Sequence, residues 1–301
     1  MNCPLCGVNE VKVIELIKRE NVVFLLKKLV ADDFSYLLSK DIKFCECNRC
    51  QLKFFYPLMV GDEFFYNSLQ KKGWYYVDDK AEYLEAKKHI KKTDKVLEVG
   101  CGKAAFVKFL QTKKYVGLDT SAKAKEMALK DGVAIECESV KDYAAKNLNK
   151  FDVVVSFQVL EHVTDPDSFI KAKIDALKVG GKLIIAVPSE DSFLKYATNN
   201  ILNMPPHHVT RWCDETLCFI AEKYNLQVLD IYHEKLQNVH RLWFAKLLIS
   251  NSLEEPRLIK STWNRKLLSM LSSILAKILV KGLKDEMLPN GHTVMAVYQK
   301  K

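Results

Sequence analysis

The chain has 301 residues, is 49% hydrophobic and carries a formal net charge of +9. This length allows one full α/β core with smaller appendages, and no run of residues reaches the ~20 apolar positions that a membrane-spanning helix needs. The positive charge favours acidic partners such as nucleotides, phosphorylated glycans, nucleic acid or anionic lipid, without choosing among them.

The nine cysteines and the start of the sequence indicate in which cellular compartment the protein is expected. Cys3 follows almost directly on Met1, which leaves no room for the charged and apolar segments of a secretory signal. We therefore expect a cytoplasmic protein whose cysteines are thiols or metal ligands rather than disulfides.

Two Cys-x-x-Cys pairs, Cys3 with Cys6 and Cys47 with Cys50, lie in the first part of the chain. Each pair presents two thiolates at a spacing that tetrahedral zinc accepts, and four protein ligands leave no open position for chemistry. The 40 residues between the pairs require a substructure, and Cys45 could replace Cys47. We expect a structural zinc site in a Cys-rich domain over residues 1–70. The alternative is a small core of reduced thiols, or a site that has lost its metal.

From about residue 80, helices and strands alternate in the way that builds a parallel sheet. The pattern predicts strands at 95–99, 115–119, 134–138, 151–157, 182–187, 226–232 and 292–298. It predicts helices at 81–92, 104–113, 121–132, 165–181 and 214–224. Asp165 and Pro166 are suited to open a helix, which Gly180 and Gly181 should end.

An insertion at 236–290 separates the last two predicted strands. Within 264–284, leucine, isoleucine and methionine fall on one half of a helical wheel, and basic and hydroxyl residues on the other. This helix is expected to pack against the domain or to form a homodimer. A peripheral contact with anionic lipid at the inner membrane face is the alternative.

A glycine turn follows the first core strand. Gly100 and Gly102 let a ligand approach the backbone closely, and Asp119 after the second strand is placed to accept hydrogen bonds from ribose hydroxyls. Both NAD and S-adenosylmethionine fit this pattern. Glu98 favours the second, because a carboxylate repels a pyrophosphate and attracts an ammonium and a sulfonium.

Four motifs then carry a resemblance to a known family. Val96-Leu-Glu-Val-Gly-Cys-Gly102, Val116-Gly-Leu-Asp119, the segment from Phe151 to Val163 and Leu177-Lys-Val-Gly-Gly-Lys-Leu183 resemble, in this order, the class I S-adenosylmethionine-dependent methyltransferases. The resemblance implies a Rossmann-like α/β fold: a seven-stranded sheet with helices on both faces and an antiparallel last strand. The core would span 71–235 and be completed by the last strand at 291–301. Ala104 stands where many members carry a third glycine.

The resemblance also implies which residues hold the cofactor. Glu98, Gly100 and Gly102 would line the methionine end, and Asp119 and Thr120 would hold the ribose. Glu138, Ser139 and Val140 would flank the adenine, and Phe157 and Gln158 would close the floor of the pocket. Independently of the resemblance, Tyr75 and Tyr76 ahead of the core could fold over the cofactor as a lid, or simply pack with other aromatic side chains.

A narrower resemblance concerns the acceptor. Asn203-Met-Pro-Pro-His-His-Val-Thr-Arg-Trp212 is similar to a segment of bacterial methyltransferases from surface-polysaccharide and sugar-modification pathways, some of which carry an N-terminal zinc-binding domain. His207 and His208 are therefore predicted to act as general base or to contact the substrate, because imidazole titrates near neutral pH. Alternatively, one caps the helix near Asp214 and the other faces water.

His162 is a third candidate near the methyl group. Together with Glu161 it could position the substrate or contribute to a divalent metal site, as similar pairs do in some quinone-pathway relatives, although a metal needs further ligands. Arg211 could bind a phosphate or carboxylate of the acceptor, or form a surface ion pair.

We expect S-adenosylmethionine-dependent methyl transfer to a small polar, anionic acceptor, most simply a hydroxyl of a sugar nucleotide or a precursor in polysaccharide biosynthesis. The alternatives are an RNA methyltransferase with a zinc-binding recognition module and a non-catalytic scaffold that binds the cofactor. Few basic residues alternate with aromatics in the Cys-rich segment, so nucleic acid is the less favoured partner.

Overall fold

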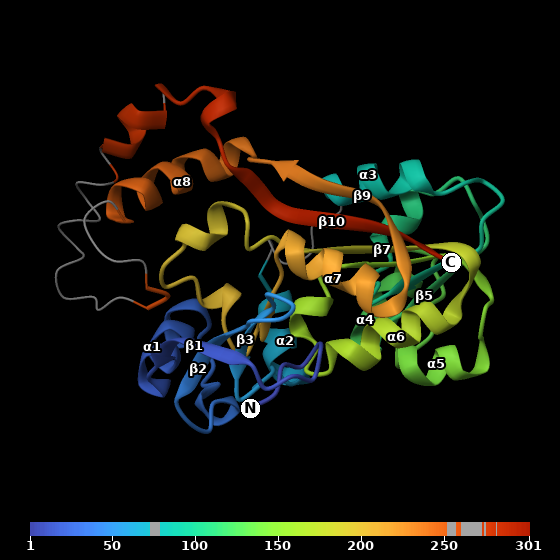
Figure 1. The fold of residues 1–301 in the computed structure, drawn as a ribbon, viewed down its shortest axis with the longest axis horizontal. Helices are drawn as coiled ribbons and strands as arrows, with labels where there is room; N and C mark the ends of the chain where they lie inside the picture. The colour runs from blue at the N-terminus through green and yellow to red at the C-terminus, as the bar shows by residue number, and fades with distance from the viewer. Residues whose placement is uncertain (73–78, 252–256, 260–272, 274, 281) are drawn as a thin grey trace.

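The computed structural model describes residues 1–72, 79–251, 257–259, 273, 275–280 and 282–301, and its main element is a mixed six-stranded sheet (Figure 1). The strand order is β5-β4-β6-β7-β10-β9. Neighbours among the first four are parallel, and β10 is antiparallel to both β7 and β9. The bounds are β4 (Val96–Val99), β5 (Tyr115–Leu118), β6 (Phe151–Phe157), β7 (Leu177–Pro188), β9 (Leu226–Lys235) and β10 (Asn290–Lys300). The Rossmann-like arrangement with an antiparallel last strand is therefore present.

The prediction of seven strands in this sheet is wrong, since the described residues form six. Segment 134–138 contributes only a single parallel bridge between Leu118 and Glu136. Ile135 is the one buried side chain in this segment. A segment at the sheet edge with so little apolar surface has little to stabilise a longer ladder.

Helices cover both faces of the sheet (Figure 1). Tyr83 and Phe106 pack with Val153 and Val155 in one cluster, whereas residues of the helices around Ile170 and Leu217 pack in another. The helices of this region are α3 (Ala81–Ala86), α4 (Ala122–Lys130), α5 (Val140–Lys146), α6 (Pro166–Ala176) and α7 (Asp214–Tyr224).

The sequence predicts the first residues of the helices better than their last residues. The Asp165 side chain accepts from the backbone N–H of Ser168 with Pro166 in the first turn, as predicted. However, α6 ends at Ala176 and β7 begins at Leu177, because Gly180 (φ +77°) lies within an irregular stretch of the β6–β7 ladder rather than at a helix end.

The predicted helix at 104–113 is also too long. Only a 3-10 helix at Ala105–Phe109 forms. Beyond it, the Thr112 hydroxyl donates to the Asp94 carbonyl (2.7 Å) and accepts from the Lys114 N–H (3.1 Å). These bonds hold the chain in a turn that leads directly into β5. Similarly, helix α3 gives way to a 3-10 turn at Lys87–His89, short of the predicted end at residue 92.

A second, antiparallel sheet lies beside the first, in the order β1-β2-β3-β8. It comprises β1 (Val11–Ile17), β2 (Ile42–Cys47), β3 (Lys53–Tyr56) and β8 (Thr210–Arg211), and carries α1 (Arg19–Leu29) and α2 (Glu63–Gln70). Three strands come from the Cys-rich segment, and the fourth follows the His207-His208 loop. Cys47, Cys50 and Phe54 share a hydrophobic cluster with Trp212 and Leu217, so the two sheets are joined by one core.

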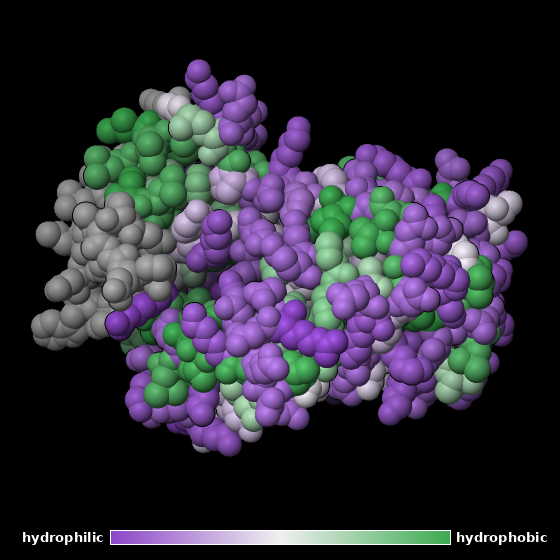
Figure 2. Space-filling view, viewed as in Figure 1, coloured by the Kyte–Doolittle hydropathy of each residue, from purple (hydrophilic) through white to green (hydrophobic). Residues whose placement is uncertain are grey.

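After β9 the chain forms α8 (Asn238–Asn251). The helix predicted over 264–284 lies largely outside the described residues, although residues 275–280 are helical. Leu275 and Ile278 are exposed there, and Figure 2 shows hydrophobic surface gathered at this end of the molecule. Within the described part of the chain, no helix combines the length and the apolar character needed to cross a bilayer.

Candidate active site

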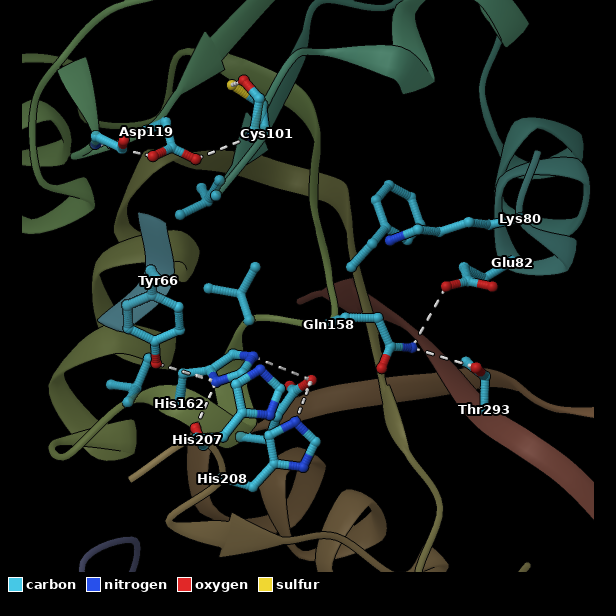
Figure 3. Close-up of a pocket in the computed structure, with 18 of the residues that line it drawn as sticks. Tyr66, Lys80, Glu82, Cys101, Asp119, Gln158, His162, His207, His208 and Thr293 are labelled. Carbon is cyan, nitrogen blue, oxygen red and sulfur yellow. Dashed lines mark hydrogen bonds and ion pairs between the residues drawn. The ribbon is translucent and has the colours of Figure 1, made fainter. Parts of the chain in front are cut away.

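A large cavity of about 1330 Å³ lies at the carboxyl ends of β4, β5 and β6 (Figure 3). Its volume is sufficient for a nucleoside-sized cofactor together with a small acceptor. Most of the residues singled out in the sequence line it: Gly100, Gly102, Asp119, Thr120, Glu138, Ser139, Val140, Phe157, Gln158, His162, His207 and His208. Tyr76 lies outside the described residues.

The glycine turn needs its glycines for two reasons. Gly100 and Gly102 have φ values of +73° and +52°, which L side chains rarely adopt. In addition, a Cβ atom on Gly100 would lie 2.5 Å from Cγ2 of Val159. Ala104 also has a positive φ, +58°, which explains why a glycine at this position would be suited to the turn.

Asp119 holds the turn from the neighbouring strand. Its Oδ2 accepts from the Gly102 N–H (2.9 Å) and its Oδ1 accepts from the Ser121 N–H (2.9 Å). Two backbone bonds fix the carboxylate at the cavity wall, where a lone pair on each oxygen can still accept from a ribose hydroxyl. Glu138, further along the wall, forms an ion pair with Lys146.

Glu98 is placed differently from the other predicted residues. It is 2% exposed and is not among the residues that line the cavity. Its carboxylate accepts a hydrogen bond from the Tyr115 hydroxyl. Burial raises the pKa of Glu98 to about 8. The prediction that Glu98 lines the methionine end is therefore not met in this structure, where Glu98 lies behind the glycine turn rather than at the cavity surface.

Gln158 and Phe157 form the floor between the two ends of the cavity. Gln158 Nε2 donates to Glu82 Oε1 (3.3 Å) and to Thr293 Oγ1 (3.2 Å) (Figure 3). The Gln158 side chain therefore links the end of β6 to α3 and to β10. The ring of Phe157 packs against Tyr83 and Phe106, with centroids 4.9 and 4.8 Å away.

The three predicted histidines, which come from two separate segments, form one cluster (Figure 3). The rings of His207 and His208 are stacked with centroids 4.4 Å apart, and the His162 ring lies 4.6 Å and 4.8 Å from them. Neither His207 nor His208 caps a helix or faces water, since both are buried. Burial lowers the pKa of His162 to about 4 and that of His207 to about 3, and it holds the pKa of His208 well below the usual value.

The Nδ1 atom of each imidazole faces an oxygen acceptor. The partners are the His207 carbonyl for His162 (2.6 Å), the Leu202 carbonyl for His207 (2.8 Å) and Oδ1 of Asn203 for His208 (3.0 Å). A neutral imidazole that donates from Nδ1 carries its lone pair on Nε2. All three rings are therefore set to accept a proton, or to bind a metal, through Nε2.

Glu161 lies against this cluster. Its Oε1 is 3.7 Å from Nε2 of His162 and 3.9 Å from Nε2 of His208. It is 1% exposed, and neither carboxylate oxygen has a hydrogen-bond partner among the described residues. Burial raises the pKa of Glu161 to about 8. The possible ligand atoms of the three histidines lie within 4.8 Å of one another, so these rings could together hold a divalent cation, and Glu161 lies beside two of them.

Several lining residues were not singled out as site residues. Tyr66 on α2 places its hydroxyl 3.3 Å from Nδ1 of His162, and Lys80, His292 and Trp243 also line the cavity. Tyr66 follows Phe64 and Phe65 in the sequence, and this aromatic run is a signal that could have drawn attention to it. The others reach the cavity through tertiary packing and carry no local signal.

Arg211 does not line the cavity and is not on the surface. It is 4% exposed and donates to the Asn203 carbonyl from Nη2 (2.7 Å) and Nε (3.2 Å). Its Nη1 lies 3.5 Å from Oε2 of Glu190, which is also buried. Both sequence-based expectations for this residue are wrong, because β8 turns its side chain into the core beside β2 and β3.

The four paired cysteines come together away from the cavity. Cys3 Sγ lies 3.5 Å from Cys50 Sγ, and Cys6 Sγ lies 3.4 Å from Cys47 Sγ. All four sulfur atoms lie within 4.8 Å of one another, and Cys45 is not part of this group. Tetrahedral zinc with Zn–S bonds of about 2.3 Å places sulfur atoms about 3.8 Å apart, so this donor set fits zinc.

Comparisons with known proteins agree with this geometry. A family model described as a methyltransferase domain matches residues 69–231. Ubiquinone biosynthesis O-methyltransferases of Salmonella newport and Salmonella typhimurium are 30% identical over 172 residues, which is 49% of this chain and 69% of each relative. A solved S-adenosylmethionine-dependent methyltransferase from Archaeoglobus fulgidus is similar in fold, with a TM-score of 0.50 and 15% identity over 79% of this chain and all of that one.

A second solved structure shares the fold at the same level. It is the complex between the Haloferax volcanii Trm112 methyltransferase activator and a protein described there as a putative methyltransferase. The TM-score is 0.50 at 16% identity, over 77% of this chain and 91% of that one.

Proposed function

Since the chain belongs to the S-adenosylmethionine-dependent methyltransferases, we propose that it methylates a hydroxyl group of a small polar molecule held against His162, His207 and His208. The observation that carries this proposal is the cluster of His162, His207 and His208, with Glu161 beside it, in the same cavity as the glycine turn. The cofactor supplies a methyl group already activated by positive sulfur. Gly100, Gly102, Asp119 and Thr120 would hold it.

The histidine cluster would act on the acceptor in two ways. It would orient the acceptor hydroxyl toward the methyl group, which saves the entropy of an encounter in water. An Nε2 lone pair would then take the hydroxyl proton as the new C–O bond forms. The hydrogen bonds at Nδ1 keep the rings in the tautomer that this step requires.

Glu161 would stabilise the imidazolium that results. A buried histidine with a lowered pKa is a weak base, so it needs a nearby negative charge at the moment it takes a proton. The carboxylate of Glu161 is within 4 Å of Nε2 of both His162 and His208. The pair would titrate as a unit rather than as two separate groups.

The acceptor we favour is a sugar nucleotide or a precursor of a surface glycan, because of the segment from Asn203 to Trp212. Lys80 lines the cavity and would face an anionic part of such a molecule. A second candidate is a quinone precursor. It is favoured by the relatives named for ubiquinone biosynthesis and by Tyr66 and Trp243, which offer aromatic surface in the cavity.

We also propose a structural zinc ion held by Cys3, Cys6, Cys47 and Cys50. Its support is the set of four close sulfur atoms beside the N-terminal sheet, three of them on buried residues and one on half-buried Cys6. For residues 264–284 we keep the proposal of a homodimer or a peripheral contact with the inner membrane face. It is supported by exposed Leu275, Ile278 and Leu279 on the described part of that helix.

Transfer of tritium from methyl-labelled S-adenosylmethionine tests the acceptor class. The purified protein is incubated with separate pools of nucleotide sugars, quinone precursors and RNA, and label is counted in each. We expect label in the nucleotide-sugar pool. Label in the quinone pool alone would establish the second candidate, and label in RNA, with binding that falls steeply with salt, would overturn both.

A further inference from the structure

His208 is oriented by Asn203, which is itself buried. Nδ1 of His208 lies 3.0 Å from Oδ1 of Asn203, and the two residues are 7% and 5% exposed. An amide oxygen can only accept, so it fixes the proton on Nδ1 and the lone pair on Nε2. Without this acceptor, the other tautomer of the ring would no longer be disfavoured.

Asn203 is in turn held by Arg211. Two guanidinium nitrogens of Arg211 donate to the Asn203 carbonyl, at 2.7 Å and 3.2 Å. A forked contact of this kind fixes the carbonyl in both distance and direction, which a single lysine nitrogen does not do. Glu190 balances the buried positive charge, with Oε2 3.5 Å from Nη1 of Arg211.

The N-terminal sheet holds Arg211 in place. Its guanidinium carbon lies 5.0 Å from the ring centre of Phe44 and 5.4 Å from that of Phe55. β3 pairs with β8 through Lys53 opposite Arg211, and Lys53 Nζ is 3.2 Å from Oε1 of Glu190. The loop that carries the histidines is thus fastened to the sheet that also carries the cysteines.

From these contacts we infer that Asn203 and Arg211 are positioning residues, through which the N-terminal sheet sets the tautomer and orientation of His208. This inference rests on the proposed function only for the role of His208 in transfer. The geometry has a physical cost, because a buried guanidinium is desolvated and needs full compensation. A carbonyl, a carboxylate and two aromatic rings provide that compensation at this one place.

The test is a long-range ¹H–¹⁵N correlation spectrum of the histidine rings in ¹⁵N-labelled protein. The His208 signals are assigned by their loss in His208→Gln, among seven histidines in all. In the wild type we expect a protonated Nδ1 and an unprotonated Nε2. In Asn203→Leu, which cannot accept, we expect a mixture of tautomers, and Arg211→Met should change the same signals.

Asn203→Asp is the conservative variant. It keeps an acceptor at Nδ1 and adds a charge, so it should retain the tautomer and raise the pKa of His208 by at least one pH unit. Arg49→Met is the matched control, because Arg49 also lies over a phenylalanine ring, 5.6 Å from the centre of Phe219, but is exposed. It should leave the His208 signals unchanged.

Calorimetry with S-adenosylhomocysteine checks the fold of each variant. Unchanged His208 signals in Asn203→Leu and Arg211→Met, with cofactor affinity within threefold of the wild type, would overturn the inference. If either variant loses cofactor binding, the decisive variant is Asn203→Asp. An unchanged pKa of His208 in Asn203→Asp would then overturn the inference. The spectrum can be recorded without a methyl acceptor. If no pool takes up label in the tritium assay, that result would therefore count against the proposed function and not against this inference.

Discussion

The two ends of the cavity are built in different ways. At the cofactor end, Gly100, Gly102, Asp119, Thr120 and Gln158 each follow closely on one of the parallel strands of the mixed sheet. At the acceptor end, the lining residues come from four separate parts of the fold: Tyr66 on α2, Glu161 after β6, His207 in the loop before β8, and Trp243 on α8. The first end depends on local backbone geometry, and the second depends on long-range packing. Damage to the second sheet should therefore affect the acceptor end more than the cofactor end.

The largest effect is expected from removing the proposed zinc. Purified protein should contain one zinc per chain, and Cys3→Ser combined with Cys50→Ser should abolish it and lower the melting temperature by about 10 °C or more. Affinity for S-adenosylhomocysteine should fall less than tenfold, because the glycine turn is in the other sheet. Cys137→Ser and Cys218→Ser, which change exposed thiols, are the controls. Protein that is fully folded without zinc would contradict the prediction.

At the cofactor end, Gly100→Ala tests the turn itself. The added Cβ would lie 2.5 Å from Val159, so we expect a loss of at least 100-fold in affinity for S-adenosylhomocysteine by calorimetry. Gly132→Ala is a matched control, because Gly132 has a similar φ of +77° with nothing within 4 Å of the added atom. Both substitutions share the backbone cost of about 1–2 kcal/mol. Equal losses of affinity would mean that the close approach at Val159 is unimportant.

The pH dependence of transfer examines the acceptor end. The pKa is about 4 for His162 and about 3 for His207, so both rings are neutral above pH 6. Their titration should therefore not change the transfer rate above that pH. Glu161, with its pKa of about 8, is protonated below that pH, so the rate should rise roughly tenfold from pH 7 to above pH 8.

Glu161→Gln should abolish this rise of the rate between pH 7 and pH 8 and lower the maximal rate, because an amide cannot stabilise the imidazolium. The initial rate of label transfer at saturating cofactor measures both effects. A limb near pH 6.5 that persists in the variant would instead indicate a solvated histidine as the base.

The smallest effect is expected from Ala104→Gly. Glycine relieves a positive φ of +58°, worth roughly 1 kcal/mol, but the variant loses a buried methyl group of about 0.8 kcal/mol. The melting temperature should change by less than about 3 °C, with cofactor affinity within threefold of the wild type. A tenfold loss of affinity would show that the methyl group itself shapes the turn.

The cofactor end could be read from the sequence because its signals are local. Strand β6 and helix α7 have the bounds that the sequence predicted, since a β-branched run and an amphipathic helix carry their own pattern. The sequence placed His207, His208 and His162 near the acceptor, and the cavity brings them together. The orientation of their rings could not be predicted, because it depends on Asn203 and Arg211, and Arg211 packs against Phe44 and Phe55, which lie more than a hundred residues earlier in the chain.

The central claim is that the histidine cluster acts on the acceptor rather than on the cofactor. His207→Ala and His208→Ala, each measured for label transfer and for S-adenosylhomocysteine affinity, test it most directly. We expect cofactor affinity within threefold of the wild type and a loss of transfer of 100-fold or more. Near-normal transfer in both variants would contradict the claim.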